Sequence, residues 1–107
     1  MSDIDFDKRL QELFENFRRQ LPERLRTILA AWNHYLESDE TAALEELRFH
    51  IHKLAGAAST YGFTEIGENA RQVETRLDDF LNQGEHAEIE RELQPRIDHI
   101  EELIKAC

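Results

Sequence analysis

Few residues in this sequence would interrupt a helix or cross-link a fold. Its 107 residues include 4 glycines, 2 prolines and one cysteine, Cys107. A lone cysteine excludes an intrachain disulfide framework and is typical of a reducing compartment, so we expect a cytoplasmic protein. No stretch approaches the roughly 18 consecutive apolar residues that a membrane span requires, and the N-terminus lacks a secretory leader. We therefore expect neither membrane insertion nor export.

Positive charge is scarce as well. Lys and Arg number 13 against 23 Asp and Glu, which gives a net charge of −10. This charge repels nucleic acid backbones and anionic membranes, so neither is an expected partner. A content of 40% hydrophobic and 34% charged residues is typical of a globular chain rather than a disordered one. At this length one hydrophobic core is expected, and residues 1–107 are interpreted as a single domain.

What the sequence does contain is apolar residues at three- and four-residue steps, which predict amphipathic helices and no strand. We expect a break at Leu21-Pro22, because proline suits the first turn of a new helix, and a left-handed helix end at Gly62. Thr64 is expected to cap the helix after it. Five helices are predicted, the last kinked at Pro95, over residues 4–17, 22–38, 41–61, 64–82 and from about 85 to the C-terminus.

Short connections between these helices favour antiparallel neighbours. The predicted fold is therefore all-α: an antiparallel up-down four-helix bundle with an additional N-terminal covering helix.

Two histidines, His50 and His52, flank the core position Ile51 in the predicted third helix, because each helical residue turns about 100°. An imidazole suits transfer of a phosphoryl group near neutral pH, since its neutral ring offers a nitrogen lone pair and also leaves readily. The small residues that follow His52 favour it over His50 as the residue that would carry the phosphoryl group. The remaining histidines are interpreted as structural or surface residues: His34, His50, His86 and His99.

The helix surface beyond His52 is nearly bare. Gly56 lies one turn after His52, and a glycine there costs about 0.5 to 1 kcal/mol relative to alanine. A glycine at this position despite that cost suggests that another molecule or helix approaches the helix closely at Gly56. Ala55, Gly56 and Ser59 belong to a run of small residues on which a partner molecule is expected to dock, above which the His52 imidazole stands.

The segment HKLAGAASTYGF, from His52 to Phe63, resembles the signature of histidine-containing phosphotransfer (HPt) domains. In that signature His, any residue, Leu, Lys and Gly are followed by small residues and then by Gly with an apolar residue. The similarity includes the preceding amphipathic helix, the following helix with Ala70 and the pair Val73-Glu74, and a final helix. It therefore covers nearly the whole chain.

The resemblance implies a role in a two-component phosphorelay. His52 would accept a phosphoryl group from the aspartate of a response-regulator receiver domain and return it, within a pathway fed by a sensor or hybrid histidine kinase. The chain would be a monomeric phosphocarrier rather than an enzyme. It would need no cofactor of its own, because the magnesium site of the receiver supplies most of the catalytic machinery.

One position departs from the family pattern. The usual lysine three residues after the histidine is Ala55 here, so the phosphoryl group lacks its expected cationic neighbour. Lys53 is the first candidate to replace it, followed by Arg48 and Arg71. By its place on the facing helix, Glu74 is a candidate for orienting the imidazole.

Three other functions compete with this one. A carboxylate-bridged metal site is disfavoured, because no histidine has Glu or Asp three residues before it. Autophosphorylation, as in a sensor kinase, is disfavoured because no glycine-rich nucleotide site is present. The missing lysine keeps a third alternative open, a pseudo-HPt module that docks a receiver domain without being phosphorylated.

Overall fold

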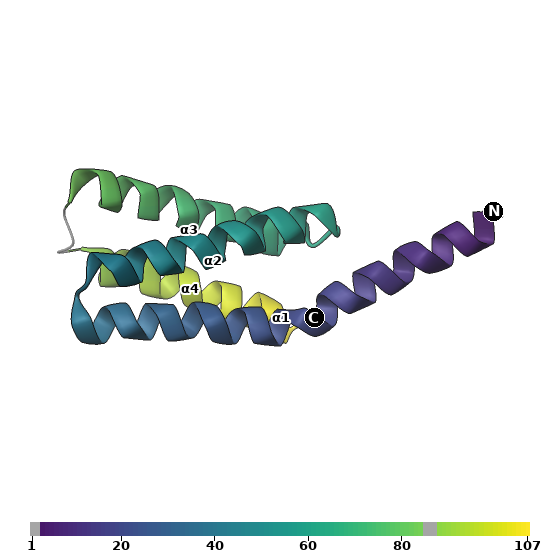
Figure 1. The fold of residues 1–107 in the computed structure, drawn as a ribbon, viewed down its shortest axis with the longest axis horizontal. Coiled ribbons are helices and arrows are strands. Elements are labelled where there is room, and N and C mark those ends of the chain that lie inside the picture. The colour runs from purple at the N-terminus through teal and green to yellow at the C-terminus, as the bar shows by residue number, and fades with distance from the viewer. Residues whose placement is uncertain (1–2, 85–87) are drawn as a thin grey trace.

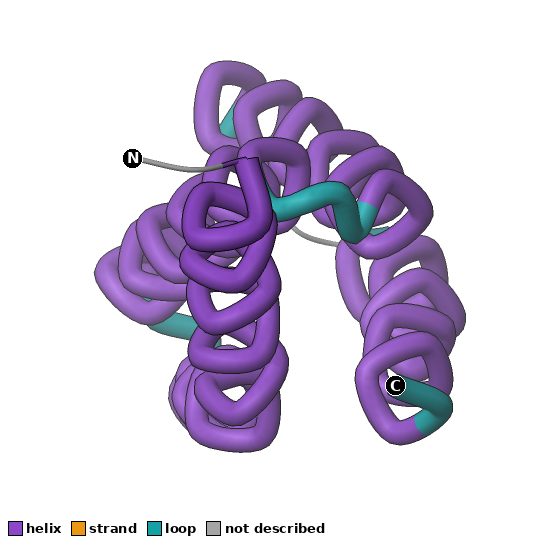
Figure 2. The backbone as a smooth tube through the Cα atoms, turned by 90° about the vertical axis from the view of Figure 1, so that its right-hand side faces the viewer, coloured by secondary structure: helices purple, strands orange, loops and turns teal. Residues whose placement is uncertain are grey.

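The computed structural model describes residues 3–84 and 88–107, and within these ranges it contains helices and no strand. Each helix contacts its sequence neighbour, and α1 also contacts α4, which closes an antiparallel bundle (Figure 1). Figure 2 shows the short loops that join the first helix to the second and the second helix to the third. The prediction of an all-helical protein is confirmed. The helices are α1 (Asp3–Ser38), α2 (Thr41–Thr60), α3 (Thr64–Gln83) and α4 (Ile89–Lys105).

The predicted break at Leu21-Pro22 is wrong, because α1 runs without interruption from Asp3 to Ser38 with Pro22 inside it. Pro22 removes the hydrogen bond to the carbonyl of Arg18, but its own ring lies on the exposed face, where water can solvate that carbonyl. The buried residues Phe17, Leu21 and Leu25 keep helical phase across the proline. Packing of this stripe therefore maintains the helix that the proline alone would end.

The N-terminal turns of α1 also do not cover the bundle as predicted. They project beyond the end of the other helices (Figure 1), and the molecule is 55 Å long but 22 by 20 Å across. The first α1 side chain that is buried is Phe17, at 2% exposure. The apolar residues before it that remain exposed are Ile4, Phe6, Leu13 and Phe14.

The core follows the predicted stripes of the remaining helices. In α2 the residues Leu44, Leu47, Ile51 and Leu54 are all fully buried. The apolar stripes of α3 and α4 behave alike. Their buried residues are Ile66, Ala70, Val73, Leu77 and Phe80 in α3, and Ile89, Leu93, Ile97, Ile100 and Ile104 in α4. The predicted start of the last helix near residue 85 lies outside the described residues.

The turn between α2 and α3 fixes how these two helices meet. Gly62 has a φ of 82°, the left-handed conformation predicted for it. The backbone N–H of Phe63 donates to the carbonyl of Ala58 at 2.8 Å and that of Gly62 to the carbonyl of Ser59 at 3.5 Å, the pattern of a Schellman motif. Thr64 is the first residue of α3 and not its N-cap, a position that Phe63 occupies without a side-chain cap.

Polar contacts hold α4 to its neighbours. The indole Nε1 of Trp32 donates to Oε1 of Gln94 at 2.8 Å, which joins α1 to α4. The Arg76 guanidinium on α3 binds Glu92 on α4 with two hydrogen bonds, and it lowers the pKa of the Glu92 carboxyl below its ordinary value.

Two helical glycines of the α2–α3 pair differ in their surroundings. A Cβ atom on Gly67 of α3 would lie 2.7 Å from Oγ of Ser59 and 3.3 Å from its backbone N, so Gly67 allows α2 and α3 to approach closely. A Cβ atom on Gly56 of α2 would meet nothing within 4 Å. Gly56 is therefore not required by packing within the described part of the chain.

We predict opposite effects of alanine at the two glycines. Gly56→Ala should raise the free energy of unfolding by about 0.5 to 1 kcal/mol, because alanine is the better helix former and has room. Gly67→Ala should lower it, because its methyl group would push α2 and α3 apart. Urea denaturation of both variants measures this, and equal effects would contradict the packing difference.

Candidate functional site

His52 lies near the middle of α2 and faces α3. Its Nδ1 atom is 2.6 Å from Oε2 of Glu74, a contact between two helices that are antiparallel neighbours. The His52 side chain is 65% exposed, whereas the Glu74 side chain is 16% exposed. One edge of the imidazole is therefore anchored on the protein while most of the ring remains open to solvent.

This contact determines which ring nitrogen is available for chemistry. An ionised carboxylate only accepts hydrogen bonds, so Nδ1 of His52 must carry the proton and donate it to Glu74. In the neutral ring the other nitrogen, Nε2, then holds the lone pair. The arrangement thus selects one tautomer and leaves the nitrogen with the lone pair on the far side of the ring from Glu74.

Glu74 is in turn held by a second pair of charged residues. Nη2 of Arg48, one turn before His52 on α2, lies 3.7 Å from Oε2 of Glu74. Nε of Arg48 donates a hydrogen bond to Oδ1 of Asp78, one turn after Glu74 on α3. This bond with Asp78 raises the pKa of the Arg48 guanidinium above its ordinary value. Arg48 is therefore fixed as a cation beside Glu74.

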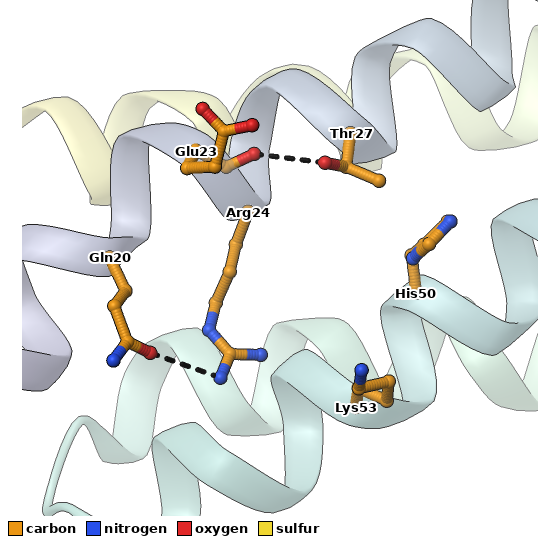
Figure 3. Close-up of a pocket in the computed structure, with 6 residues that line it drawn as sticks. All are labelled: Gln20, Glu23, Arg24, Thr27, His50 and Lys53. Carbon is orange, nitrogen blue, oxygen red and sulfur yellow. Dashed lines mark hydrogen bonds between the residues drawn. The ribbon is translucent and has the colours of Figure 1, made fainter.

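The three candidate replacements for the missing lysine are in different environments. Arg48 is engaged with Asp78 and Glu74, as described above. Lys53 points to the other side of α2, where its Nζ lies 5.2 Å from the centre of the Phe49 ring and faces α1 (Figure 3).

Arg71 lies on α3, opposite the turn of α2 that follows His52. Because α2 and α3 are antiparallel and Glu74 lies opposite His52, Arg71 is level with Ala55. The Arg71 side chain is exposed and lines a shallow hollow with Ser59, Thr64 and Glu68. Its guanidinium makes no hydrogen bond or ion pair with any side chain that the structure describes.

The small residues beyond His52 do not all form one exposed surface. Gly56 is exposed, and Ser59 is exposed at the edge of the contact with Gly67. Ala55, in contrast, is 3% exposed and belongs to the core, which corrects the expectation that it offers a surface to a partner. The exposed aromatic residue beside His52 is Phe49, one turn earlier and 55% exposed.

The other described histidines lie at the surface or its boundary. His34 and His99 are exposed, and His50 is partly exposed with Nε2 3.8 Å from Oε1 of Glu46. Within residues 3–84 and 88–107, no three His, Cys, Asp or Glu side chains gather as metal ligands would. His86 lies outside the described residues. None of the described helices has a stretch that is long and apolar enough to cross a membrane.

Sequence reasoning missed two residues of this site, Asp78 and Gly67. Asp78 follows Glu74 by four residues on the same face of α3, so pairing Glu74 with His52 also pairs Asp78 with Arg48. Asp78 could therefore have been predicted from the alignment of α2 with α3 that pairs His52 with Glu74. Gly67 could have been suspected because a glycine in a helix that otherwise keeps its periodicity often marks a close approach.

Three comparisons with known proteins were made, and a family model matches this chain. A search of curated proteins and a search of solved structures gave no significant match. The family model described as Hpt domain matches residues 12–106. Domains of this family take part in phosphorelays with receiver domains and histidine kinases, as phosphocarriers rather than enzymes. The match covers nearly the whole sequence, and the chain therefore belongs to the Hpt domain family.

Proposed function

We propose that this chain relays phosphoryl groups between receiver-domain aspartates through a phosphohistidine at His52. The observation that carries the proposal is the contact of His52 Nδ1 with Glu74 at 2.6 Å on a ring that is 65% exposed. A nucleophile for a docked protein must be both oriented and accessible, and His52 satisfies both requirements.

The proposed transfer is an in-line displacement at phosphorus. Nε2 of His52 attacks the aspartyl phosphate of a docked receiver, the N–P bond forms, and the aspartate oxygen leaves with the electron pair of the O–P bond. The imidazole gains positive charge as this happens and keeps its Nδ1 proton. Glu74 offsets that charge, in the way that a buried carboxylate stabilises an imidazolium in other sites.

Arg48 acts in this scheme as a positioning residue. It lies within 3.7 Å of Glu74 and is bound to Asp78, so it holds the Glu74 carboxylate in place rather than reaching for the phosphoryl group. A guanidinium that already has a carboxylate partner is poorly placed to follow a new anion.

Arg71 is our first choice for the cation beside the phosphoryl group. It is level with Ala55, where the family usually has its lysine, and its guanidinium has no acidic partner among the described residues. Lys53, the first choice from sequence alone, points toward α1 instead. A guanidinium also suits phosphate, because its planar fork can donate two parallel hydrogen bonds.

The docking surface would be the exposed part of α2 around His52, with Phe49 on one side and Gly56 on the other. An aromatic anchor beside a bare stretch of helix fits a modest interface, of the kind that lets relay partners separate quickly. The partners would be receiver domains and a hybrid or sensor histidine kinase in the cytoplasm. Magnesium would come from the receiver, and this chain would hold no cofactor of its own.

A second function is favoured by one observation, the alanine at position 55. Without the usual lysine, the module would still dock a receiver domain but would not stabilise the phosphoryl group. The chain would then act as a pseudo-HPt interaction module on the same surface. The two functions differ in one covalent event, which can be measured.

A labelling experiment with the variant His52→Gln distinguishes the phosphocarrier from the pseudo-HPt interaction module. We expect the wild-type protein, incubated with a phosphorylated receiver domain, to gain a phosphate seen in its intact mass and lost in acid. His52→Gln should gain none, and His50→Gln should be labelled like the wild type. If the wild-type protein binds several receivers but is labelled by none of them, the phosphocarrier function is wrong and the docking module remains.

The cation assignment is tested by the rate of this transfer. Arg71→Gln should slow single-turnover transfer about tenfold, since a hydrogen bond between charged groups contributes roughly 1.5 kcal/mol or more. Lys53→Gln removes the same charge from the other side of α2 and should change the rate little. A larger loss in Lys53→Gln than in Arg71→Gln would reverse the assignment.

A further inference from the structure

A hollow between α1 and α2, on the side of α2 away from Glu74, gathers basic side chains in an acidic protein. It has a volume of about 310 Å³. Its lining comes from both helices (Figure 3) and consists of Gln20, Glu23, Arg24, Thr27, His50 and Lys53.

The two strong cations of this hollow lack acidic partners. Neither Arg24 nor Lys53 forms an ion pair with any residue in the described ranges, although acidic residues outnumber basic ones 23 to 13 over the sequence. The lining carboxylate, Glu23, is 2.7 Å from Nη2 of Arg26 and points away from the Arg24 guanidinium (Figure 3). His50 is 3.8 Å from Glu46. The positive charge in the hollow is therefore left largely uncompensated.

Both cations are held in place by aromatic rings. The guanidinium carbon of Arg24 lies 5.3 Å from the centre of the Phe17 ring, and Nη2 of Arg24 donates to Oε1 of Gln20 at 3.3 Å. Nζ of Lys53 lies 5.2 Å from the centre of the Phe49 ring. Stacking of this kind reduces the freedom that each side chain would lose on binding a ligand.

Only part of the Arg24 guanidinium can face the hollow. Nε of Arg24 is buried and makes no hydrogen bond to any described atom. Because the protein covers this atom, a ligand in the hollow would bind the Nη atoms of the guanidinium instead. An oxyanion between Arg24 and Lys53 would compensate both charges at once.

We propose that this hollow binds a phosphate-sized oxyanion, either free phosphate or the phosphoryl end of a phosphomonoester. Arg24 supplies directed N–H donors, Lys53 supplies a second charge from the facing helix, and the Gln20 amide lies at the edge. The site is separate from the His52–Glu74 contact, because Lys53 and His52 project from α2 in different directions. It does not depend on phosphorylation of His52.

The test uses the full chain and two probes, inorganic phosphate and glycerol 3-phosphate, at constant ionic strength. We expect saturable NMR shifts at the Arg24 Nε–H and at residues around Lys53 and Thr27. Arg24→Gln and Lys53→Gln should each weaken binding at least about fivefold, since each removes a charge-assisted contact. Tighter binding of the ester would identify a phosphorylated small molecule as the ligand, and tighter binding of phosphate a free anion.

Two matched variants make the result specific. Arg19→Gln removes the same charge from α1 outside the hollow, at a side chain that contacts Asn16, and should bind like the wild type. His52→Gln should also bind like the wild type, so failure of the phosphocarrier function would leave this result unchanged. The proposal is overturned if shifts do not saturate, if chloride reproduces them, if Arg24→Gln keeps full affinity, or if His52→Gln abolishes binding.

Discussion

The contact between His52 and Glu74 joins the packing of the bundle to the chemistry of the site. It requires α2 and α3 to be antiparallel, in one register and close together. The Schellman turn at Gly62 sets that path, and Gly67 permits the close approach. The same register places Asp78 against Arg48, which steadies Glu74. A shift of one turn between α2 and α3 would separate the His52 imidazole from the Glu74 carboxylate, even if the core residues stayed buried.

Much of the fold could be predicted because each helix buries one regular stripe, as in α2 and α3. The failure at Pro22 is instructive. Local preference favoured a new helix there, but Phe17, Leu21 and Leu25 keep one helix in phase across the proline, and their burial outweighs a single lost hydrogen bond. The projecting first turns of α1 were also missed, since an amphipathic stripe does not reveal whether its partner lies in the same chain.

Some residues of the two sites could be predicted from the sequence and others could not. His52 and Gly56 could be found from neighbours within one helix. Asp78, Gly67 and the Arg24–Lys53 hollow could not, because they depend on how two helices face each other. The direction of Lys53 follows from a turn of about 100° per residue, which separates it from its neighbour His52 despite their adjacency in sequence. Adjacency along a helix is thus weaker evidence for a shared site than contact across helices.

The most direct test of this arrangement is to identify the phosphorylated nitrogen. After transfer from a phosphorylated receiver domain to ¹⁵N-labelled protein, phosphorus–nitrogen couplings in the NMR spectrum show which ring atom of His52 carries the phosphoryl group. Because Glu74 holds the proton on Nδ1, we expect phosphorus on Nε2 with Nδ1 still protonated. Phosphorus on Nδ1 of His52, or on His50, would contradict the role of the contact between His52 and Glu74.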